Sequence, residues 1–142
     1  MSTNALISVM TKNSHNEDIY KTIYCHWNGY LSHLGAILFK NYNTAELANA
    51  LVSLGDASCI EEKLTPTGEH SFDEPENGVC VFYHRDRGED WGNTKPRELW
   101  ADEFRKDNKL VYTYLFKDNA WYYKKPDGQR FFKLTENMFS DD

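Results

Sequence analysis

Alternating apolar and polar positions dominate the start of the chain, which is the pattern of β-strands. "NALISVMTK" and "YKTIYCHW" are two β-rich runs, and the polar, turn-forming "NSHNED" separates them. In the second run Ile23, Cys25 and Trp27 share one face, while Tyr24 and His26 share the other. The pattern therefore predicts a β-hairpin with a loose connecting loop.

The strand pattern stops at Asn28-Gly29, where glycine permits a turn. After this turn the spacing of the apolar residues changes to that of a helix. Apolar residues recur at helical spacing from Leu31 to Tyr42. A second helix follows after about three residues, with Thr44 as its N-cap and Gly55 as the glycine that ends it. The sequence predicts two helices packed as a hairpin, the second with an apolar stripe formed by Leu47, Leu51 and Leu54.

The middle of the chain contains a polar segment, a strand pattern, a charged segment and a helix pattern, in that order. Residues 56–77 are polar, acidic and contain two prolines, so we expect a mobile surface loop with one short strand. "GVCVFYH", residues 78–84, predicts a strong strand that leads into the charged, glycine-punctuated loop "RDRGEDWGN". "TKPRELWADEFRKDN" then predicts a third, shorter helix, with Thr94 as its cap and Pro96 near its first turn.

The last third of the chain returns to strand patterns. "KLVYTYLFKDNAWYYKKPDGQRFFKL" predicts two or three strands, with Asp118-Asn119 and Asp127-Gly128 as hairpin turns, followed by a short disordered C-terminal tail. The whole chain, residues 1–142, is predicted to be a single α+β domain. We expect a mostly antiparallel β-sheet, with the two-helix hairpin and one further short helix packed on it.

Charge and composition narrow the functional classes. The 142 residues carry a net charge of −6, with an isoelectric point near 5.3, which disfavours direct binding to duplex DNA because phosphate contacts need a clustered positive surface. The three cysteines are widely separated and form no CxxC pair, so free thiols are expected. No 18-residue apolar run and no signal peptide is present. We therefore expect a soluble, cytoplasmic protein without a membrane contact.

Two catalytic or metal hypotheses have weak support. Cys25 and His26 are adjacent strand residues that point to opposite faces, so His26 cannot easily activate the thiol, and core packing of Cys25 is favoured. His26, His33 and His84 could converge on a metal ion, but no HExxH or Cys/His ligand spacing supports this. No catalytic residue, metal ligand or cofactor is therefore assigned, and binding is favoured over catalysis.

The segment "YHRDRGEDWGN" offers donors for an anion or a partner. Arg85 and Arg87 flank Asp86, and an arginine fork matches phosphate or carboxylate. Internal ion pairs with the neighbouring carboxylates are the competing interpretation. If the strand before this segment ran parallel and next to the strand that ends in "HWNGY", both segments would rim one concave patch; antiparallel strands would separate them. The candidate binding residues are His26, Trp27, Tyr30, His84, Arg85, Asp86, Arg87 and Glu89.

The C-terminal hairpin is rich in aromatic residues and lysines. Such a surface could stack on single-stranded nucleic acid. Cross-strand core pairs of aromatics, with lysines protecting the strand edges, are the favoured interpretation. The residues concerned are Tyr112, Tyr114, Trp121, Tyr122, Tyr123, Phe131 and Phe132, with Lys117, Lys124, Lys125, Arg130 and Lys133.

Four motifs together resemble a group of small proteins encoded by bacteriophages and prophages. They are "IYCHWNGY", "LGD" after the two helices, "YHRDRGE" and the aromatic "YLFKDNAWYY", and they span roughly residues 5–124. The usual form of the group has an IYCHWDGYP-like opening, so this chain departs from it at Asn28 and Leu31. The matching positions are Tyr24, Cys25, His26, Trp27, Gly29, Tyr30, Gly55, Asp56, Tyr83, Arg85, Asp86, Arg87, Gly88 and Glu89.

The resemblance implies a phage origin and setting, and it implies no mechanism. We expect a small accessory protein that binds a host protein or defence complex, such as a bacterial defence or nucleic-acid-handling system, and an acidic inhibitor could compete there for a basic groove. The alternative is binding of a small anionic ligand such as a nucleotide through "HWNGY" and "RDRGE". An enzyme acting on that ligand, with His26 or His84 as its base, ranks third, and a homodimer remains an open alternative.

Overall fold

The first two strands form the predicted hairpin. In the computed structural model, which describes residues 3–136 and 139, β1 (Ala5–Lys12) pairs antiparallel with β2 (Asp18–Cys25) along its full length. The side chain of Asn13 organises the connecting loop, because its Oδ1 accepts hydrogen bonds from the backbone N–H groups of His15 and Glu17. Such an Asx-type turn explains how a polar loop without glycine reverses the chain.

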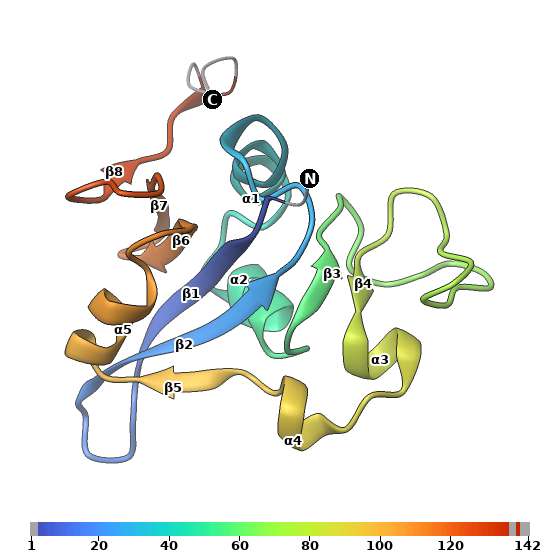
Figure 1. Ribbon diagram of the computed structural model, residues 1–142, viewed down its shortest axis with the longest axis horizontal. Helices are drawn as coiled ribbons and strands as arrows, with labels where there is room; N and C mark the ends of the chain where they lie inside the picture. The colour runs from blue at the N-terminus through green and yellow to red at the C-terminus, as the bar shows by residue number, and fades with distance from the viewer. Residues whose placement is uncertain (1–2, 137–138, 140–142) are drawn as a thin grey trace.

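The predicted helix pair is present and packs on one face of the sheet. A π-helical turn, η1 (Leu31–Gly35), leads directly into α1 (Ala36–Asn41), and α2 (Ala45–Val52) follows. Buried side chains from all three segments enter the same core as the apolar residues of β1 and β2. The main core therefore lies between this pair of helices and the sheet (Figure 1).

The N-cap of α2 is confirmed, whereas its C-terminal end and its buried face are shifted. Thr44 Oγ1 accepts a hydrogen bond of 3.1 Å from the Leu47 N–H, which is an N-cap contact. Gly55 has a positive φ of 87°, as its glycine identity allows, but it lies two residues after the C-cap Ser53 and so one position beyond the predicted one. The predicted stripe is wrong at Leu47, which is 41% exposed, because Ala48 and Val52 face the core beside Leu51 instead.

The strands form one mixed sheet in the order β4-β3-β2-β1-β6-β7-β8, with β5 paired to β2. The β1–β6 and β2–β3 pairs are parallel, and the other pairs are antiparallel. The α+β class with a mostly antiparallel sheet is therefore confirmed. The further strands are β3 (Ala57–Cys59), β4 (Val81–Phe82), β5 (Arg97–Leu99), β6 (Tyr112–Lys117), β7 (Ala120–Lys124) and β8 (Phe132–Lys133).

The predicted strand at residues 78–84 is wrong over most of its length. Only Val81 and Phe82 pair as β4, and the chain turns at once into α3 (Tyr83–Arg87). The cause is Asp86, whose Oδ2 accepts a 2.8 Å hydrogen bond from the Phe82 N–H at the start of the helix. The "RDRGEDWGN" segment, predicted as a loop, thus contains α3 and a second short helix, α4 (Trp91–Thr94).

The third predicted helix begins later than expected. Residues next to Pro96 pair with β2 as β5, and α5 (Ala101–Asp107) begins only after Trp100. The Glu103 side chain accepts a 2.9 Å hydrogen bond from the Trp100 N–H, which fixes this start. Thr94, predicted as the cap, instead lies at the end of α4 and donates to the Asp90 carbonyl.

Of the two predicted C-terminal turns, the one at Asp127-Gly128 is shifted: the Gly128 N–H donates to the Lys125 oxygen, so Pro126 and Asp127 are the central residues of a turn in the longer connection between β7 and β8. The other turn is correct. Asp118 and Asn119 both have positive φ angles and join β6 to β7 as a two-residue hairpin. The loop predicted over 56–77 contains the one expected short strand, β3, and its mobility stays a prediction. The predicted disordered C-terminal tail lies outside the described residues.

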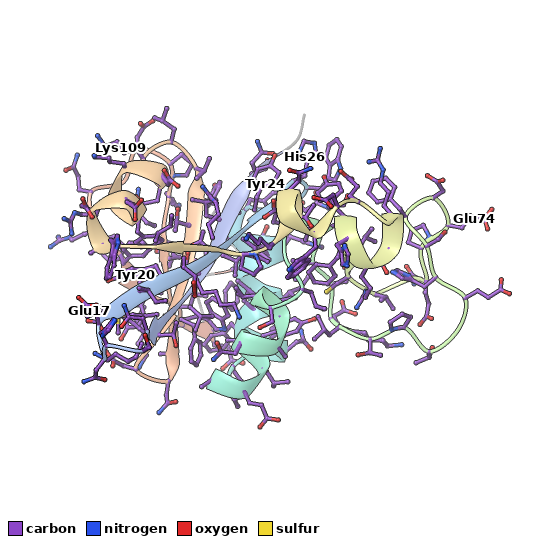
Figure 2. The ribbon with its side chains drawn as sticks, turned by 90° about the horizontal axis from the view of Figure 1, so that it is seen from below. Glu17, Tyr20, Tyr24, His26, Glu74 and Lys109 are labelled. Atoms are coloured by element: carbon purple, nitrogen blue, oxygen red, sulfur yellow. The ribbon has the colours of Figure 1, made fainter. Side chains whose placement is uncertain are left out.

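A smaller core covers the opposite face of the sheet. Leu99, Phe104 and Leu115 form it, with Tyr20 and Phe131 packed against them. The Phe104 ring stacks on Tyr20, with centroids 4.5 Å apart, and also on Phe131 at 5.9 Å. Figure 2 shows α2 and α5 on opposite sides of the sheet. Within the part of the chain that the structure describes, no helix is long and apolar enough to span a bilayer.

Gly55 and Gly88 offer a matched test of this fold. Both have positive φ, but a Cβ at Gly55 would lie 2.4 Å from the Thr94 carbonyl oxygen, whereas nothing lies within 4 Å at Gly88. We expect Gly88→Ala to lower the free energy of unfolding by about 1–2 kcal/mol through backbone strain alone. Gly55→Ala should lower it by about 2–5 kcal/mol, because strain and overpacking add. Urea denaturation measures both, and equal losses would contradict the close contact between Gly55 and α4.

Candidate functional site

The strands that lead to the two candidate segments are not parallel neighbours. β3 lies between β2 and β4, runs parallel to β2 and runs antiparallel to β4. The strand arrangement on which the predicted concave patch depended is therefore absent. The residues of "HWNGY" and "RDRGE" meet only where other contacts draw the segments together.

Asp56 makes that connection. Its carboxylate Oδ1 accepts a 2.9 Å hydrogen bond from the Tyr24 N–H at the end of β2. Its backbone oxygen accepts from the Tyr83 N–H at the start of α3, and its own N–H donates to the Thr94 oxygen of α4. Burial raises the pKa of the Asp56 carboxyl, while the hydrogen bond from Tyr24 opposes that rise. One residue thus ties three segments into a single corner of the molecule.

Aromatic side chains gather around this corner. The Tyr24 hydroxyl lies 2.7 Å from His26 Nδ1, and the His26 ring packs edge-on against Trp27. Burial is the main cause of the raised pKa of Tyr83; a hydrogen bond with Ser58 opposes the rise, and the Tyr24 phenol adds to it electrostatically. Figure 2 shows Tyr24 and His26 on the side of the sheet away from α2. We call this set the aromatic surface: Tyr24, His26, Trp27, Phe72, Tyr83, His84 and Trp91.

The aromatic surface continues onto α3 and α4. The Tyr83 ring lies 5.7 Å from Phe72, and the His84 ring lies 5.1 Å from Trp91. Two of its tryptophans remain open to solvent, since Trp27 is 45% and Trp91 39% exposed. The rings form three contacting groups, and the Asp56 hydrogen bonds link the segments that carry them. Large exposed rings held in this way are typical of interaction sites.

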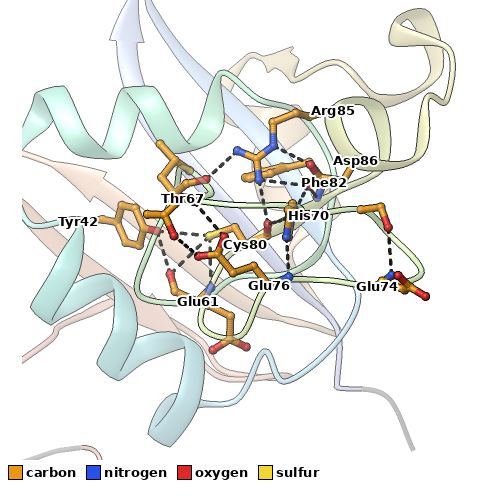
Figure 3. Close-up of polar contacts among 12 residues, drawn as sticks. Tyr42, Glu61, Thr67, His70, Glu74, Glu76, Cys80, Phe82, Arg85 and Asp86 are labelled. Atoms are coloured by element: carbon orange, nitrogen blue, oxygen red, sulfur yellow. Dashed lines mark hydrogen bonds and ion pairs between the residues drawn. The ribbon is translucent and has the colours of Figure 1, made fainter.

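Arg85 and Asp86 belong to a buried network, as the internal ion-pair interpretation expected. The Asp86 side chain is only 4% exposed and accepts from Arg85 Nε at 2.9 Å. The remaining Arg85 nitrogens donate to the carbonyls of Leu64 and Cys80 at 2.7 and 2.9 Å (Figure 3). The Arg85 guanidinium is thus committed inside the protein, which weakens the small-anion hypothesis for this site.

Sequence reasoning missed His70, the third member of this network. Its Nδ1 accepts a 2.9 Å hydrogen bond from the Glu76 N–H, so the ring proton lies on Nε2. That Nε2 lies 3.1 Å from the Cys80 oxygen and 3.3 Å from Asp86 Oδ2. The imidazole is 1% exposed, and it fastens the 60–77 loop to α3. A lone histidine in an acidic loop was the only signal in the sequence.

The remaining candidate residues have different surroundings. Arg87 is 54% exposed; its guanidinium lies 4.6 Å over the Phe72 ring and 3.6 Å from Glu89. His84 Nδ1 donates to the backbone oxygen of Glu89 at 2.7 Å. Tyr30 precedes η1, and its ring lies 6.1 Å from that of His33. His26, Trp27 and His84 therefore belong to the aromatic surface, Arg87 and Glu89 lie at its edge, and Tyr30 belongs to the helix start.

The histidines proposed to converge on a metal ion have separate partners. His33 pairs with Glu61 at 3.4 Å, His26 with Tyr24, and His84 with the Glu89 backbone. Among the described residues, no group of three or more His, Cys, Asp or Glu side chains has the arrangement of a metal site. The geometry around His26 and His84 favours hydrogen-bonded roles, whereas His33 Nε2, beside Glu61, is buried without a hydrogen-bond partner among the described residues.

Cys25 is a core residue. It is fully buried, and its thiol donates to the Trp27 carbonyl at 3.5 Å. Burial raises the pKa of the Cys25 thiol far above its ordinary value. A thiol that stays protonated and out of contact with solvent cannot serve as a nucleophile.

Comparisons with known proteins do not indicate a function for this chain. The chain matches no protein-family model, no curated protein and no solved structure. The aromatic surface and the buried network beneath it are therefore the features from which a function has to be inferred.

Asp86→Asn should lower the free energy of unfolding by about 3–5 kcal/mol, because Arg85 would keep its burial and lose its counter-charge. Burial favours a raised pKa for Asp86, but the Arg85 and Phe82 hydrogen bonds and the Arg85 charge outweigh it, so the pKa is lowered. In the wild-type protein, ionised Asp86 therefore makes its full contribution to the free energy of unfolding above the unfolded-state pKa of about 3.9. That contribution is lost as the pH falls through the lower pKa of the folded state.

Denaturant unfolding between pH 7 and pH 2 measures both effects. The difference in free energy of unfolding between the wild-type protein and the Asp86→Asn variant should become smaller toward pH 2. Glu89→Gln is the matched control, since its carboxylate is 42% exposed and its arginine contact is 3.6 Å long; it should change stability by less than about 1 kcal/mol. Equal losses in the two variants would contradict the buried role of Asp86.

Thiol labelling tests the assignment of the cysteines. Cys25 and Cys80 are buried, and Cys59 is partly exposed with its pKa raised by burial to about 11. In native protein at pH 8 we expect Cys59 to react with a disulfide reagent slowly, and Cys25 and Cys80 not to react until the protein unfolds. Mass spectrometry of the labelled peptides distinguishes the sites. Rapid native labelling of Cys25 would restore it as a candidate nucleophile.

Proposed function

We propose that the protein acts by binding another protein through the aromatic surface, without catalysing a reaction. The observation that carries this proposal is the exposure of Trp27 and Trp91, each packed against a histidine ring, on segments that Asp56 ties together. Tryptophan, tyrosine and arginine are the residue types most enriched among those that dominate binding energy at protein interfaces. The aromatic surface contains two tryptophans and two tyrosines, and Arg87 borders it.

The scaffold beneath the aromatic surface favours tight binding. Asp56 fixes the backbone at Tyr24 and Tyr83, and the Tyr24–His26 hydrogen bond orients both rings. Side chains that are already ordered lose less conformational entropy when a partner arrives. The aromatic surface is therefore built as a preorganised contact.

The positions of the candidate acid–base groups support binding over catalysis. His70 and Asp86 form a histidine–carboxylate pair, but their side chains are 1% and 4% exposed, so a substrate cannot reach them. His26 and His84 each have a hydrogen-bond partner at 2.7 Å, and Cys25 is fully buried. These groups hold the surface in shape.

The charge next to the aromatic surface suggests the kind of partner. The loop over residues 60–77 carries six carboxylates against one lysine, and its Phe72 is part of the aromatic surface. A partner with a basic rim around an apolar centre would complement it. Proteins that handle nucleic acids have basic surfaces, because they contact phosphates. The resemblance to phage proteins supports a phage-type accessory protein that meets such a host partner in the host cytoplasm.

Trp27 and Trp100 provide a matched test of this proposal, because they are 45% and 46% exposed. Trp100 lies before α5, away from the aromatic surface. Tagged wild-type protein should retain one bacterial protein in stoichiometric amount, identified by native mass spectrometry. With that partner purified, calorimetry should show at least about 30-fold weaker binding for Trp27→Ala and no change for Trp100→Ala.

Two outcomes would exclude the aromatic surface as the interface: retention of no stoichiometric partner, and equal binding by both tryptophan variants. A homodimer that persists in both variants would also exclude the aromatic surface from the dimer contact. Melting temperatures of the two variants within a few degrees of the wild type would show that the comparison reports binding.

A further inference from the structure

A cavity of about 530 Å³ lies at the other end of the molecule, between α5, the end of β7 and the segment that leads to β8. Figure 2 labels Lys109 beside this region and Glu74 of the acidic loop at the opposite end. Its volume is within the range of small-molecule sites. The cavity shares no residue with the aromatic surface, so an inference about it is independent of the proposed function.

The lining of the cavity is strongly cationic in an acidic protein. Its cationic side chains come from Arg105, Lys109, Lys124 and Arg130, and Asp127 supplies the single carboxylate. The whole chain carries a net charge of −6. A local concentration of positive charge against that background attracts anions to this cavity in particular.

Two buried donors line the same cavity. Lys124 is 5% exposed and Asn108 is 4% exposed. Lys124 Nζ donates to the backbone oxygens of Asn108, at 2.7 Å, and Gly128, at 3.5 Å. The Asn108 side-chain Nδ2 is buried without a hydrogen-bond partner among the described residues. A buried amide donor without an acceptor is costly, and Asn108 would relieve that cost by turning its amide toward an anion in the cavity that it lines.

A backbone hydrogen bond holds together the two segments that carry these donors. The Asp127 N–H donates to the Lys109 oxygen at 3.0 Å, which ties the segment after β7 to the segment after α5. Burial lowers the pKa of Lys124, while the Asp127 carboxylate opposes that change. An arriving anion would favour the charged ammonium in the same way.

An aromatic wall stands beside the donors. Phe131 lines the cavity and stacks nearly parallel to Phe104, with an interplanar angle of 12°. Phe104 is 3% exposed and in turn stacks on Tyr20. Leu110, 74% exposed, adds an apolar group at the rim. A ligand with a planar ring next to its anionic group matches this combination.

We propose that this cavity binds a nucleoside monophosphate, with the phosphate held by Lys124 and Asn108 and the base against Phe131 and Leu110. Arg105, Lys109 and Arg130 surround the phosphate end. The Arg130 guanidinium lies 5.6 Å over the Phe132 ring, which keeps it at the rim. The site differs from the one that the sequence suggested for an anion, where Arg85 is committed internally.

Isothermal calorimetry of the full chain with AMP, GMP, CMP and UMP tests this proposal, with adenosine and inorganic phosphate as partial ligands. At least one monophosphate should bind, at least about tenfold more tightly than either adenosine or phosphate, since both ends of the site contribute. The Asn108 side-chain amide signals should shift on titration in ¹⁵N-resolved NMR spectra. Absence of binding for all four monophosphates at millimolar concentration would overturn the proposal.

Variants locate the site. Lys124→Met keeps the length of the buried side chain and should weaken monophosphate binding about tenfold or more. Arg105→Ala, at an exposed position that need not affect folding, should weaken it several-fold. Lys106→Ala is the matched control, because Lys106 is the exposed neighbour on α5 that does not line the cavity. If Lys106→Ala weakens binding as much as Arg105→Ala, diffuse charge attraction explains the binding and the proposed site is wrong.

Discussion

The buried carboxylate of Asp86 is the constraint on which the end of the molecule with the aromatic surface depends. A charge removed from water has to be compensated by donors close at hand. Arg85, the Phe82 N–H and His70 supply them, each from a different part of the local chain. To do so, the backbone has to leave the sheet at Tyr83, the 60–77 loop has to close over α3, and Arg85 has to turn inward. Of the two arginines beside Asp86, only Arg87 has a largely exposed side chain.

Asp56 gives the same corner its shape through the backbone. By accepting from Tyr24 and Tyr83 and donating to Thr94, it converts three separate chain segments into one support for aromatic rings. The cavity near Lys124 depends on neither aspartate, because its walls come from α5, β7 and the second core. The molecule therefore has two regions of opposite local charge on independently built supports.

The sequence predicted those features that short segments determine. The Thr44 cap, the left-handed Gly55 and the two-residue turn at Asp118 each depend on residues a few positions apart. Strand alternation correctly placed Tyr24 with His26. It was wrong for Trp27, expected on the buried face, because β2 ends at Cys25 and Trp27 is exposed. The strand expected over 78–84 failed because a β-rich composition cannot reveal that a carboxylate four residues on will cap a helix at Phe82. The site was predictable only in part for the same reason. Arg85 and Asp86 could be recognised as an internal pair because they are adjacent, whereas only the folded path of the loop brings His70 to them.

The parallel pairing of β1 with β6 has a consequence for how the chain is made. Ala5 lies opposite Tyr112. The edge of β1 that pairs with β6 therefore stays uncovered until most of the chain has left the ribosome. Contacts so distant in sequence slow folding, and an uncovered apolar strand edge can pair with other chains in the meantime. The growing polypeptide thus passes through a stage at which the hairpin of β1 and β2 is complete and its open edge is exposed to chaperones and to aggregation.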